Sequence, residues 1–211
     1  MTLVLLKESA VILVCYTVGC FASGYYWVRW RTGLDIRNFG SGSVGARNVG
    51  RVLGPWGFAV TLLADITKGV ITVVLAQKCG LRPDAVIAAM MGVVIGHTWP
   101  VQLRFHGGKG IATSLGALLI YDPLLVLILA VVFLPIWIFL RSFTLSGMLA
   151  YALSPLAVFF CRLGNLEVAA VSFIAIVVLV AHQKNIREEF ARLCAERAEK
   201  QDSVHHKESG S

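Results

Sequence analysis

The eleven residues I-A-T-S-L-G-A-L-L-I-Y, Ile111 to Tyr121, decide how often this chain crosses a membrane. As a helix they rise only about 16 Å, whereas the hydrocarbon core of a bilayer is about 30 Å thick. If the segment crosses by borrowing Gly108 to Gly110 and residues beyond Pro123, then Arg141 and the stretch Lys184 to Arg192 lie in the cytoplasm. If it is re-entrant, both lie outside. Because basic residues concentrate on the cytoplasmic side, we expect the segment to cross.

The chain as a whole has the composition of an integral membrane protein. Of its 211 residues, 57% are apolar and 15% charged, and the mean hydropathy is +0.75. Soluble domains have roughly 45–50% apolar and about 25% charged residues. Six further apolar stretches are expected to span: Ser9 to Val28, Trp56 to Gln77, Ala85 to Phe105, Leu124 to Leu140, Phe143 to Leu163 and Val168 to Ala181. The sequence therefore predicts an all-α polytopic membrane protein with seven transmembrane helices.

The loop after the first span fixes the predicted orientation. From Arg29 to Arg51 it holds five arginines and a single acid, Asp35, so it is placed in the cytoplasm. The N-terminus is then outside and the C-terminus inside. We expect one transmembrane domain, residues 1–183, and a charged cytoplasmic tail, residues 184–211. The net charge of +7 suits anionic lipid head groups or anionic substrates.

The first polar segment is G-S-G-S-V-G-A-R-N-V-G-R, from Gly40 to Arg51. Its glycines permit backbone conformations that bring N–H groups close to an anion. Ser41 and Ser43 add hydroxyls, and Arg47 and Arg51 share a face if this end is helical. The alternative interpretation is a flexible basic loop that only contacts lipid.

The second polar segment is G-H-T-W-P-V-Q-L-R-F-H-G-G-K-G, from Gly96 to Gly110. A glycine-lysine-glycine turn that opens a helix combines amide donors, a positive dipole end and an ammonium, which suits a phosphate. It is not a Walker A loop, because Gly110 rather than Ser or Thr follows Lys109. For Lys109 the alternative is snorkelling toward the interface, and for His97 it is a hydrogen bond that packs helices.

Two further sets of polar residues lie at the end of the last span and inside the second span. In H-Q-K-N-I-R, from His182 to Arg187, His182 and Asn185 are three residues apart and face the same way on a helix. In the second span Asp65 and Lys68 are also three apart and are expected to pair. Ionisable residues inside a membrane are candidates for function, although a structural ion pair is an equal alternative for Asp65.

In this order and spacing the segments resemble the motifs of the bacterial acyl-phosphate:glycerol-3-phosphate acyltransferases, the PlsY family. The matching patterns are G-S-G-x-x-G-A-x-N-x-x-R, D-x-x-K-G, G-H…F-x-G-G-K-G-x-A-T and H-Q-K-N-I-R, which together cover nearly the whole chain. The resemblance implies a seven-span enzyme of the bacterial inner membrane with its active site on the cytoplasmic face. Such an enzyme moves an acyl group from acyl phosphate to glycerol 3-phosphate and releases lysophosphatidic acid and phosphate.

The motifs and the resemblance give two sets of candidate site residues. The catalytic set is Ser41, Arg51, Lys109, His182 and Asn185. The substrate-binding set is Gly40, Gly42, Arg47, Asn48, Asp65, Gly107, Gly108 and Gly110. The partners implied are glycerol 3-phosphate, long-chain acyl phosphate and membrane lipid, with no nucleic acid, and a monomer suffices. No metal or cofactor is expected, because the scattered cysteines have no ligand spacing and acyl phosphate is already activated.

The sequence departs from the family pattern in both flanking motifs. Ser43 stands where the family usually has asparagine, and Arg47 where it has threonine. Glu188 to Phe190 replace a leucine pair, and no G-x-E follows, so the role of that glutamate is not assigned. The base is left open between His182 and a substrate phosphate, and we favour the substrate. The alternative function is a diverged member that transports or binds a phosphorylated solute.

Overall fold

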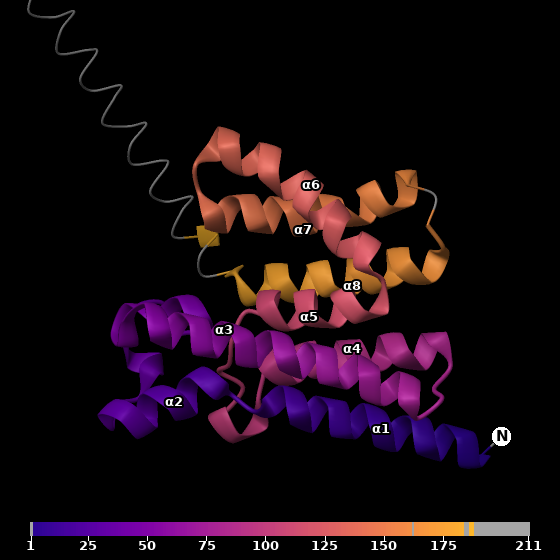
Figure 1. Ribbon diagram of the computed structural model, residues 1–211, viewed down its shortest axis with the longest axis horizontal. Helices are drawn as coiled ribbons and strands as arrows, with labels where there is room; N and C mark the ends of the chain where they lie inside the picture. The colour runs from indigo at the N-terminus through magenta and orange to yellow at the C-terminus, as the bar shows by residue number, and fades with distance from the viewer. Residues whose placement is uncertain (1, 162, 184–185, 188–211) are drawn as a thin grey trace, which may run out of the picture. The chain divides into compact units, whose positions relative to one another are not determined.

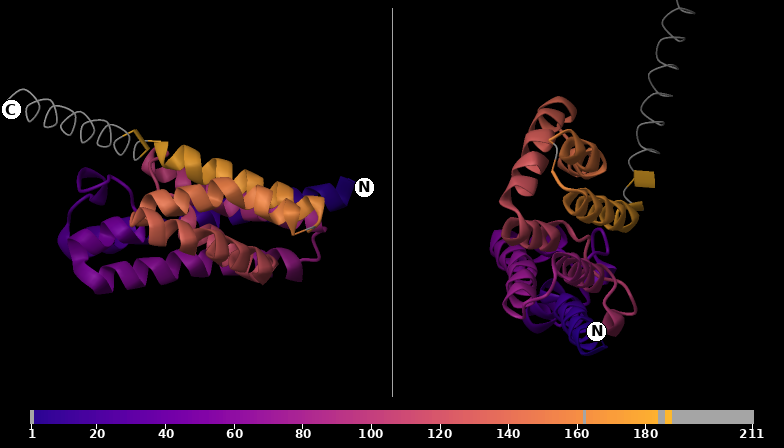
Figure 2. Two further views of the ribbon diagram at one scale, coloured as in Figure 1. Left: turned by 90° about the horizontal axis from the view of Figure 1, so that it is seen from above. Right: turned by 90° about the vertical axis from the view of Figure 1, so that its right-hand side faces the viewer.

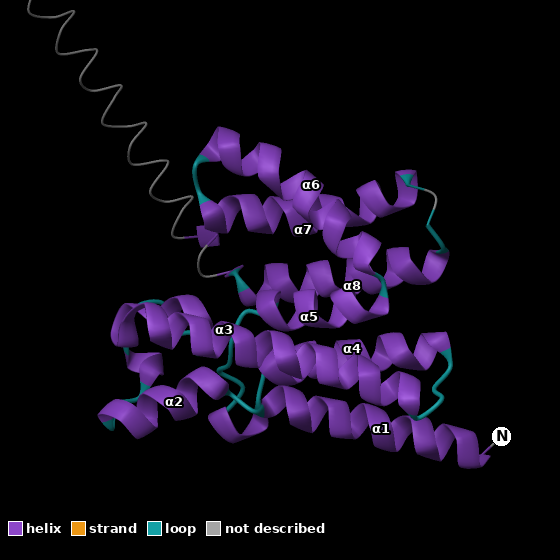
Figure 3. Ribbon diagram, in the orientation of Figure 1, coloured by secondary structure: helices purple, strands orange, loops and turns teal. Residues whose placement is uncertain are grey.

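The protein is helical throughout the part of the chain that the structure, a computed structural model, describes, and no strand occurs there (Figures 1 and 3). The described residues are 2–161, 163–183 and 186–187. The chain divides into two compact units, Met1–Ala181 and His182–Ser211. The first unit contains α1 (Thr2–Cys20), α2 (Ser23–Thr32), α3 (Ala46–Lys78), α4 (Pro83–Thr98), α5 (Ile111–Tyr121), α6 (Pro123–Leu140), α7 (Phe143–Phe160) and α8 (Asn165–Ala181), with short 3-10 helices η1 (Ile36–Asn38) and η2 (Val101–Leu103).

Seven of these helices are apolar, which confirms the predicted all-α polytopic membrane fold. Five helical stretches in the described residues are long and apolar enough to cross a bilayer: Thr2–Thr32, Ala46–Lys78, Pro83–Leu103, Pro123–Leu140 and Phe143–Phe160. The shorter apolar helices are α5 and α8. The helix α5 has the bounds that the sequence indicated for the deciding segment. The orientation of the termini and the domain boundary after residue 183 stay predictions.

The first span was wrongly predicted as one continuous helix. The chain breaks at Phe21 and Ala22, where α1 ends and the short, polar α2 begins. A helix end exposes carbonyls that need donors, and distant side chains supply them. Lys68 Nζ donates to the carbonyl oxygens of Gly19 (3.4 Å) and Phe21 (3.1 Å), and Gln102 Nε2 donates to that of Cys20. The break is therefore stabilised by residues far away in the sequence.

The second and third spans also differ from the prediction at the ends that adjoin the polar motifs. The helix α3 begins ten residues before Trp56, at Ala46, and kinks where Gly54 has φ +70° ahead of Pro55. The helix α4 ends at Thr98 rather than near Phe105, because the chain turns away at Pro100. Both polar motifs consequently stand next to helix ends rather than inside spans.

Glycines allow the central helices to cross at backbone contact. On α4, a Cβ at Gly96 would lie 2.2 Å from the carbonyl oxygen of Tyr16 on α1. Where α3 crosses α5, a Cβ at Gly69 would lie 2.1 Å from the oxygen of Thr113, and one at Gly116 2.1 Å from that of Ile66. Small residues at helix crossings are the usual basis of packing within membranes. These contacts pack α4 closely against α1 and α3 closely against α5.

Gly116→Ala should destabilise the protein by about 1–3 kcal/mol or more, because the new methyl group forces two backbones apart. Gly147 on α7 is the matched control, since a Cβ there meets nothing within 4 Å. Its alanine variant should be as stable as the parent. Thermal unfolding midpoints in one detergent compare the two variants, and equal midpoints would contradict this view of the α3–α5 crossing.

The interhelical connections gather at two ends of the first unit, as two views show (Figures 1 and 2). At one end the amide of Val44 donates to the carbonyl oxygen of Gly107 at 3.3 Å, joining the α2–α3 and α4–α5 connections. The α6–α7 turn lies on the same side in Figure 1. At the other end Arg82 donates to Glu8 on α1 at 3.0 Å. The candidate site is built at the first of these ends.

Candidate active site

The loop before α3 is organised around the buried side chain of Asn48. Its Nδ2 donates to the carbonyl oxygens of Phe39 (2.9 Å) and Ser43 (2.8 Å). Its Oδ1 accepts a hydrogen bond from the amide of Ser41 at 3.1 Å. Asn48 is only 2% exposed, so these bonds form largely without competition from water. The prediction placed Asn48 among the substrate-binding residues, whereas in this structure its amide group holds the loop itself.

Arg51 lies on the same short helical stretch and extends over Gly40. Gly40 has φ +55°, and a Cβ there would lie 2.3 Å from Asn48 Oδ1 and 3.1 Å from Arg51 Nη1. Glycine at this position therefore lets the loop close against both side chains. Arg51 is exposed, and among the described residues no hydrogen bond or ion pair engages its guanidinium. Ser41 follows Gly40 directly, so a serine hydroxyl and a cation are both presented by this loop.

Two other arginines of the first loop, Arg37 and Arg47, are already engaged. Arg37 pairs with Asp35 at 2.6 Å and also donates to the carbonyl oxygen of Leu103 at 3.0 Å. The hydrogen bond from Arg37 holds the pKa of the Asp35 carboxyl below its ordinary value. Arg47 donates to Thr144 at the start of α7. Arg47 thus ties the loop to a neighbouring helix, and its predicted contact with substrate stays a prediction.

The glycine loop between α4 and α5 is fixed to the end of α4 by main-chain bonds. The amide of Gly107 donates to the carbonyl oxygen of Thr98 at 3.1 Å, and that of Gly108 to the oxygen of His97 at 2.9 Å. We expected these two amides to face a ligand, and the predicted contact of Gly107 and Gly108 with substrate stays a prediction. In this structure both amides donate to acceptors within the protein. The lack of side chains at Gly107 and Gly108 lets the backbone of the loop lie close to the end of α4.

The turn then leads directly into α5. Gly110 has φ +81° at the helix N-cap, a left-handed conformation that favours glycine. The amides in the first turn of α5 have no acceptor within the helix, and the half-buried Lys109 precedes them. A Cβ on Gly110 would lie 3.7 Å from Val178 on α8. The α8 helix therefore ends at Ala181 close to this turn.

A buried ionic cluster lies behind the glycine loop. Lys68 Nζ is 3.0 Å from Asp65 Oδ1, which confirms the expected pair, and 2.7 Å from His97 Nδ1. Ser23 Oγ donates to the same Asp65 oxygen at 3.0 Å. Asp65, Lys68 and His97 are all buried. In this structure Asp65 is engaged with Lys68 and Ser23, and its predicted role in substrate binding stays a prediction.

The third motif belongs to the second unit. His182 is its first residue, and Asn185 lies outside the described residues. Their predicted roles in catalysis therefore stay predictions. The first unit brings together Gly40, Ser41 and Gly42 on the loop before α3 with Asn48 and Arg51 at the start of α3. Val44 joins this loop to Gly107, two residues before Lys109.

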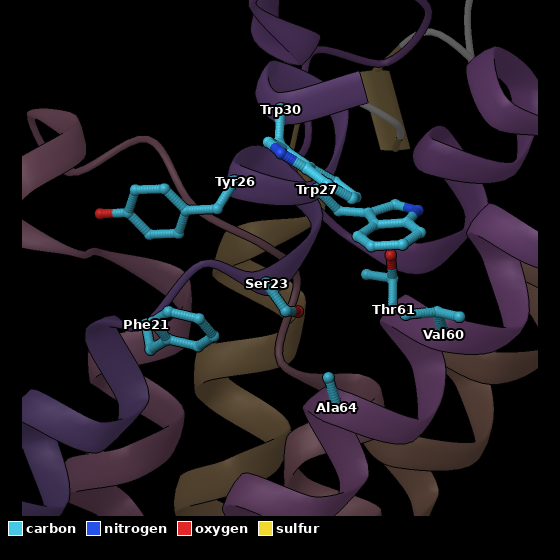
Figure 4. Close-up of a pocket in the computed structure, with 8 residues that line it drawn as sticks. All are labelled: Phe21, Ser23, Tyr26, Trp27, Trp30, Val60, Thr61 and Ala64. Carbon is cyan, nitrogen blue, oxygen red and sulfur yellow. The ribbon is translucent and has the colours of Figure 1, made fainter. Parts of the chain in front are cut away.

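A groove of about 330 Å³ opens between α2 and α3 (Figure 4). It is lined by Phe21, Ser23, Tyr26, Trp27, Trp30, Val60, Thr61 and Ala64. Its walls are mostly aromatic and aliphatic, and it includes none of the predicted site residues. In the part of the chain that the structure describes, no group of three or more His, Cys, Asp or Glu side chains is arranged to hold a metal ion.

The sequence did not indicate the structural roles of Gln102, Thr144 and Ser23. Gln102 donates to the end of α1, Thr144 accepts from Arg47, and Ser23 donates to Asp65. Their partners lie 42 to 97 residues away, so no local pattern reveals them. In the buried cluster the sequence pointed to the ionisable residues of the spans, Asp65, Lys68 and His97, but not to Ser23.

The fold and the joined loops define a class of protein: an integral membrane protein with glycine-rich and cationic connections meeting at one end of its helices. Residues 9–192 match the family model described as glycerol-3-phosphate acyltransferase. The chain is 42% identical over 179 residues to glycerol-3-phosphate acyltransferase 1 of Desulfitobacterium hafniense (strain Y51), covering 84% of this chain and 88% of that protein. It therefore belongs to the glycerol-3-phosphate acyltransferase family, the PlsY family, as the motifs indicated.

Other comparisons agree with this assignment. The chain is 38% identical over 183 residues to glycerol-3-phosphate acyltransferase of Geobacter sulfurreducens, covering 87% of this chain and 94% of that protein. Its fold is similar to the crystal structure of PlsY, an integral membrane glycerol 3-phosphate acyltransferase, in the glycerol 3-phosphate form. The TM-score is 0.78 at 28% identity, over 87% of this chain and 92% of that chain. For the lysophosphatidic acid form the TM-score is 0.75 at 25% identity, with the same coverage.

Proposed function

We propose that this protein transfers a long-chain acyl group from acyl phosphate to the sn-1 hydroxyl of glycerol 3-phosphate, giving lysophosphatidic acid and phosphate. The observation that carries the proposal is the bond between Val44 and Gly107. It holds the loop of Ser41 and Arg51 beside the turn of Lys109, so that cations of both motifs serve one site. Both proposed substrates carry a phosphate, so a site with several cations suits them. Membership of the family supports the proposed reaction.

In the proposed reaction the acceptor hydroxyl oxygen attacks the acyl carbonyl carbon. The new ester bond forms, the bond between that carbon and the phosphate oxygen breaks, and phosphate leaves with the electron pair. The hydroxyl proton passes to a substrate phosphate oxygen, with His182 as the alternative acceptor. Arg51 and Lys109 stabilise the phosphates, Ser41 orients a substrate by hydrogen bonding, and His182 and Asn185 assist in placing it.

The donor assay tests this proposal. Purified protein in detergent or lipid is given glycerol 3-phosphate with acyl phosphate, acyl-CoA or an acylated acyl carrier protein, and lysophosphatidic acid is followed. We expect product only with acyl phosphate, because the site as proposed offers cations for a small phosphate leaving group. Product formed equally well from acyl-CoA would contradict the donor assignment. Binding of glycerol 3-phosphate without any product would favour the alternative, a transporter or binding protein for a phosphorylated solute.

We also propose that the N-terminus lies outside and the site faces the cytoplasm of a bacterial inner membrane, as the arginine-rich first loop suggests. Thiol labelling tests this orientation at two exposed positions, His106 and Asp84. In a variant without native cysteines, His106→Cys should react with an impermeant thiol reagent only after permeabilisation. Asp84→Cys, at the other end of α4, should react in intact cells. The reverse pattern would overturn the orientation.

A further inference from the structure

Lys68 contacts one edge of the His97 ring. A lysine ammonium only donates hydrogen bonds, and Lys68 Nζ lies 2.7 Å from His97 Nδ1. When Lys68 is the donor in this contact, Nδ1 accepts and the ring proton is on Nε2. Lys68 is itself held by Asp65 at 3.0 Å and by the carbonyl oxygen of Phe21 at 3.1 Å. Since Lys68 and His97 are 5% and 4% exposed, one edge of the ring is held by a buried lysine side chain.

The opposite edge of the His97 ring lies against the glycine loop. A Cβ on Gly108 would be 2.0 Å from His97 Nε2 and 2.4 Å from Cε1. The main chain of the same residue is also bound, because the amide of Gly108 donates to the carbonyl oxygen of His97 at 2.9 Å. Position 108 is thus set by both the ring and the backbone of His97. Lys109 and the amino end of α5 follow immediately.

We propose that Lys68 and His97 are positioning residues for the phosphate site. Lys68 orients the His97 ring, and the ring fixes the position of Gly108 by contact. The position of Gly108 in turn sets the direction in which Lys109 and the first turn of α5 face the phosphate of the acceptor. Neither side chain touches the substrate. Asp65 and Ser23 act one step further back by holding Lys68. The inference rests on the proposed function, because it concerns the residues that align the proposed binding site for glycerol 3-phosphate.

Two substitutions of His97 separate its two edges. In His97→Asn the side-chain carbonyl still reaches toward Lys68, but nothing remains to contact Gly108. In His97→Gln the terminal amide replaces Nε2, but Lys68 loses its acceptor. Because both edges are required, each variant should raise the KM for glycerol 3-phosphate by about tenfold or more while kcat and the KM for acyl phosphate change by less than about threefold. A residue needed only for folding would instead lower the yield and thermal stability without a selective change in KM.

A double variant provides the specific readout. Gly108→Ala alone should raise the KM for glycerol 3-phosphate, because its methyl group collides with the ring. In the shorter His97→Asn background the added methyl group has room, so the double variant should be no worse than His97→Asn alone. Fully additive losses, or equal rises in the KM of both substrates, would overturn the proposal. Direct binding of glycerol 3-phosphate is measured in parallel. Binding that persists in a parent protein without turnover refutes the proposed reaction, whereas unchanged binding in both His97 variants refutes the positioning role.

Discussion

Arg51→Ala should lower kcat/KM by about 10- to 100-fold or more while the protein still folds. Among the loop arginines, Arg37 is paired with Asp35 and Arg47 donates to Thr144, whereas the exposed guanidinium of Arg51 extends over Gly40 next to Ser41. A charge-assisted hydrogen bond to a phosphate contributes roughly 1.5–3 kcal/mol, and about 1.4 kcal/mol corresponds to a tenfold change in rate. Steady-state kinetics with both substrates measures the loss.

The lysine variant and a control separate substrate binding from attraction to lipid. Arg51→Lys should recover only part of the activity, because an ammonium lacks the bidentate fork of a guanidinium. Arg29 is equally basic and exposed on α2, outside the motif, so Arg29→Ala should stay near the parent. Equal losses at both positions, with full rescue by lysine at each, would show that the loop acts through general surface charge.

Asn48→Ala should abolish most activity, with a loss of more than about 100-fold, and leave the helical bundle intact. The change removes the partners of two buried or half-buried carbonyl oxygens and one amide, at about 1–3 kcal/mol for each unsatisfied group. The loop that presents Ser41 and Arg51 then loses its fixed shape. Circular dichroism in detergent should show unchanged helix content, while activity measured on the same sample falls.

Asn38 offers a matched comparison for Asn48. It lies on η1 in the same loop, is exposed, and makes no side-chain hydrogen bond to the described residues, so Asn38→Ala should retain nearly full activity. Asn48→Asp keeps an acceptor for the amide of Ser41 but aims a carboxylate at carbonyl oxygens, and it should be as inactive as the alanine variant. Substantial activity in Asn48→Asp would contradict the organising role of the Nδ2 donor.

Helix number and the bounds of α5 were predictable because apolar length is a property of the sequence itself. The break between α1 and α2 was not, since it depends on Lys68 and Gln102 donating to carbonyls across the fold. The start of α3 was missed for another reason. The Gly54–Pro55 pair indicates a break, but the helix continues past it as a kink.

The location of the candidate site was predictable from the sequence, but the roles of its residues were only partly so. Motif spacing identified the two loops, and the structure joins them through Val44 and Gly107. The spacing did not separate a residue that holds the loop from one that contacts a ligand, because the acceptors of Asn48 are main-chain oxygens that no residue type reveals. The pairing of Asp65 with Lys68 followed from their spacing, but the third partner, His97, comes from another helix, and no pattern in the sequence indicated that it contacts Lys68.

The stoichiometry of the reaction tests the central claim most directly. Purified protein is incubated with acyl phosphate, with and without glycerol 3-phosphate, while inorganic phosphate and lysophosphatidic acid are quantified together. Direct transfer at one shared site predicts one phosphate released for each lysophosphatidic acid formed, and almost no phosphate release without the acceptor. Rapid phosphate release in the absence of glycerol 3-phosphate, or binding of both compounds with neither product, would contradict the account.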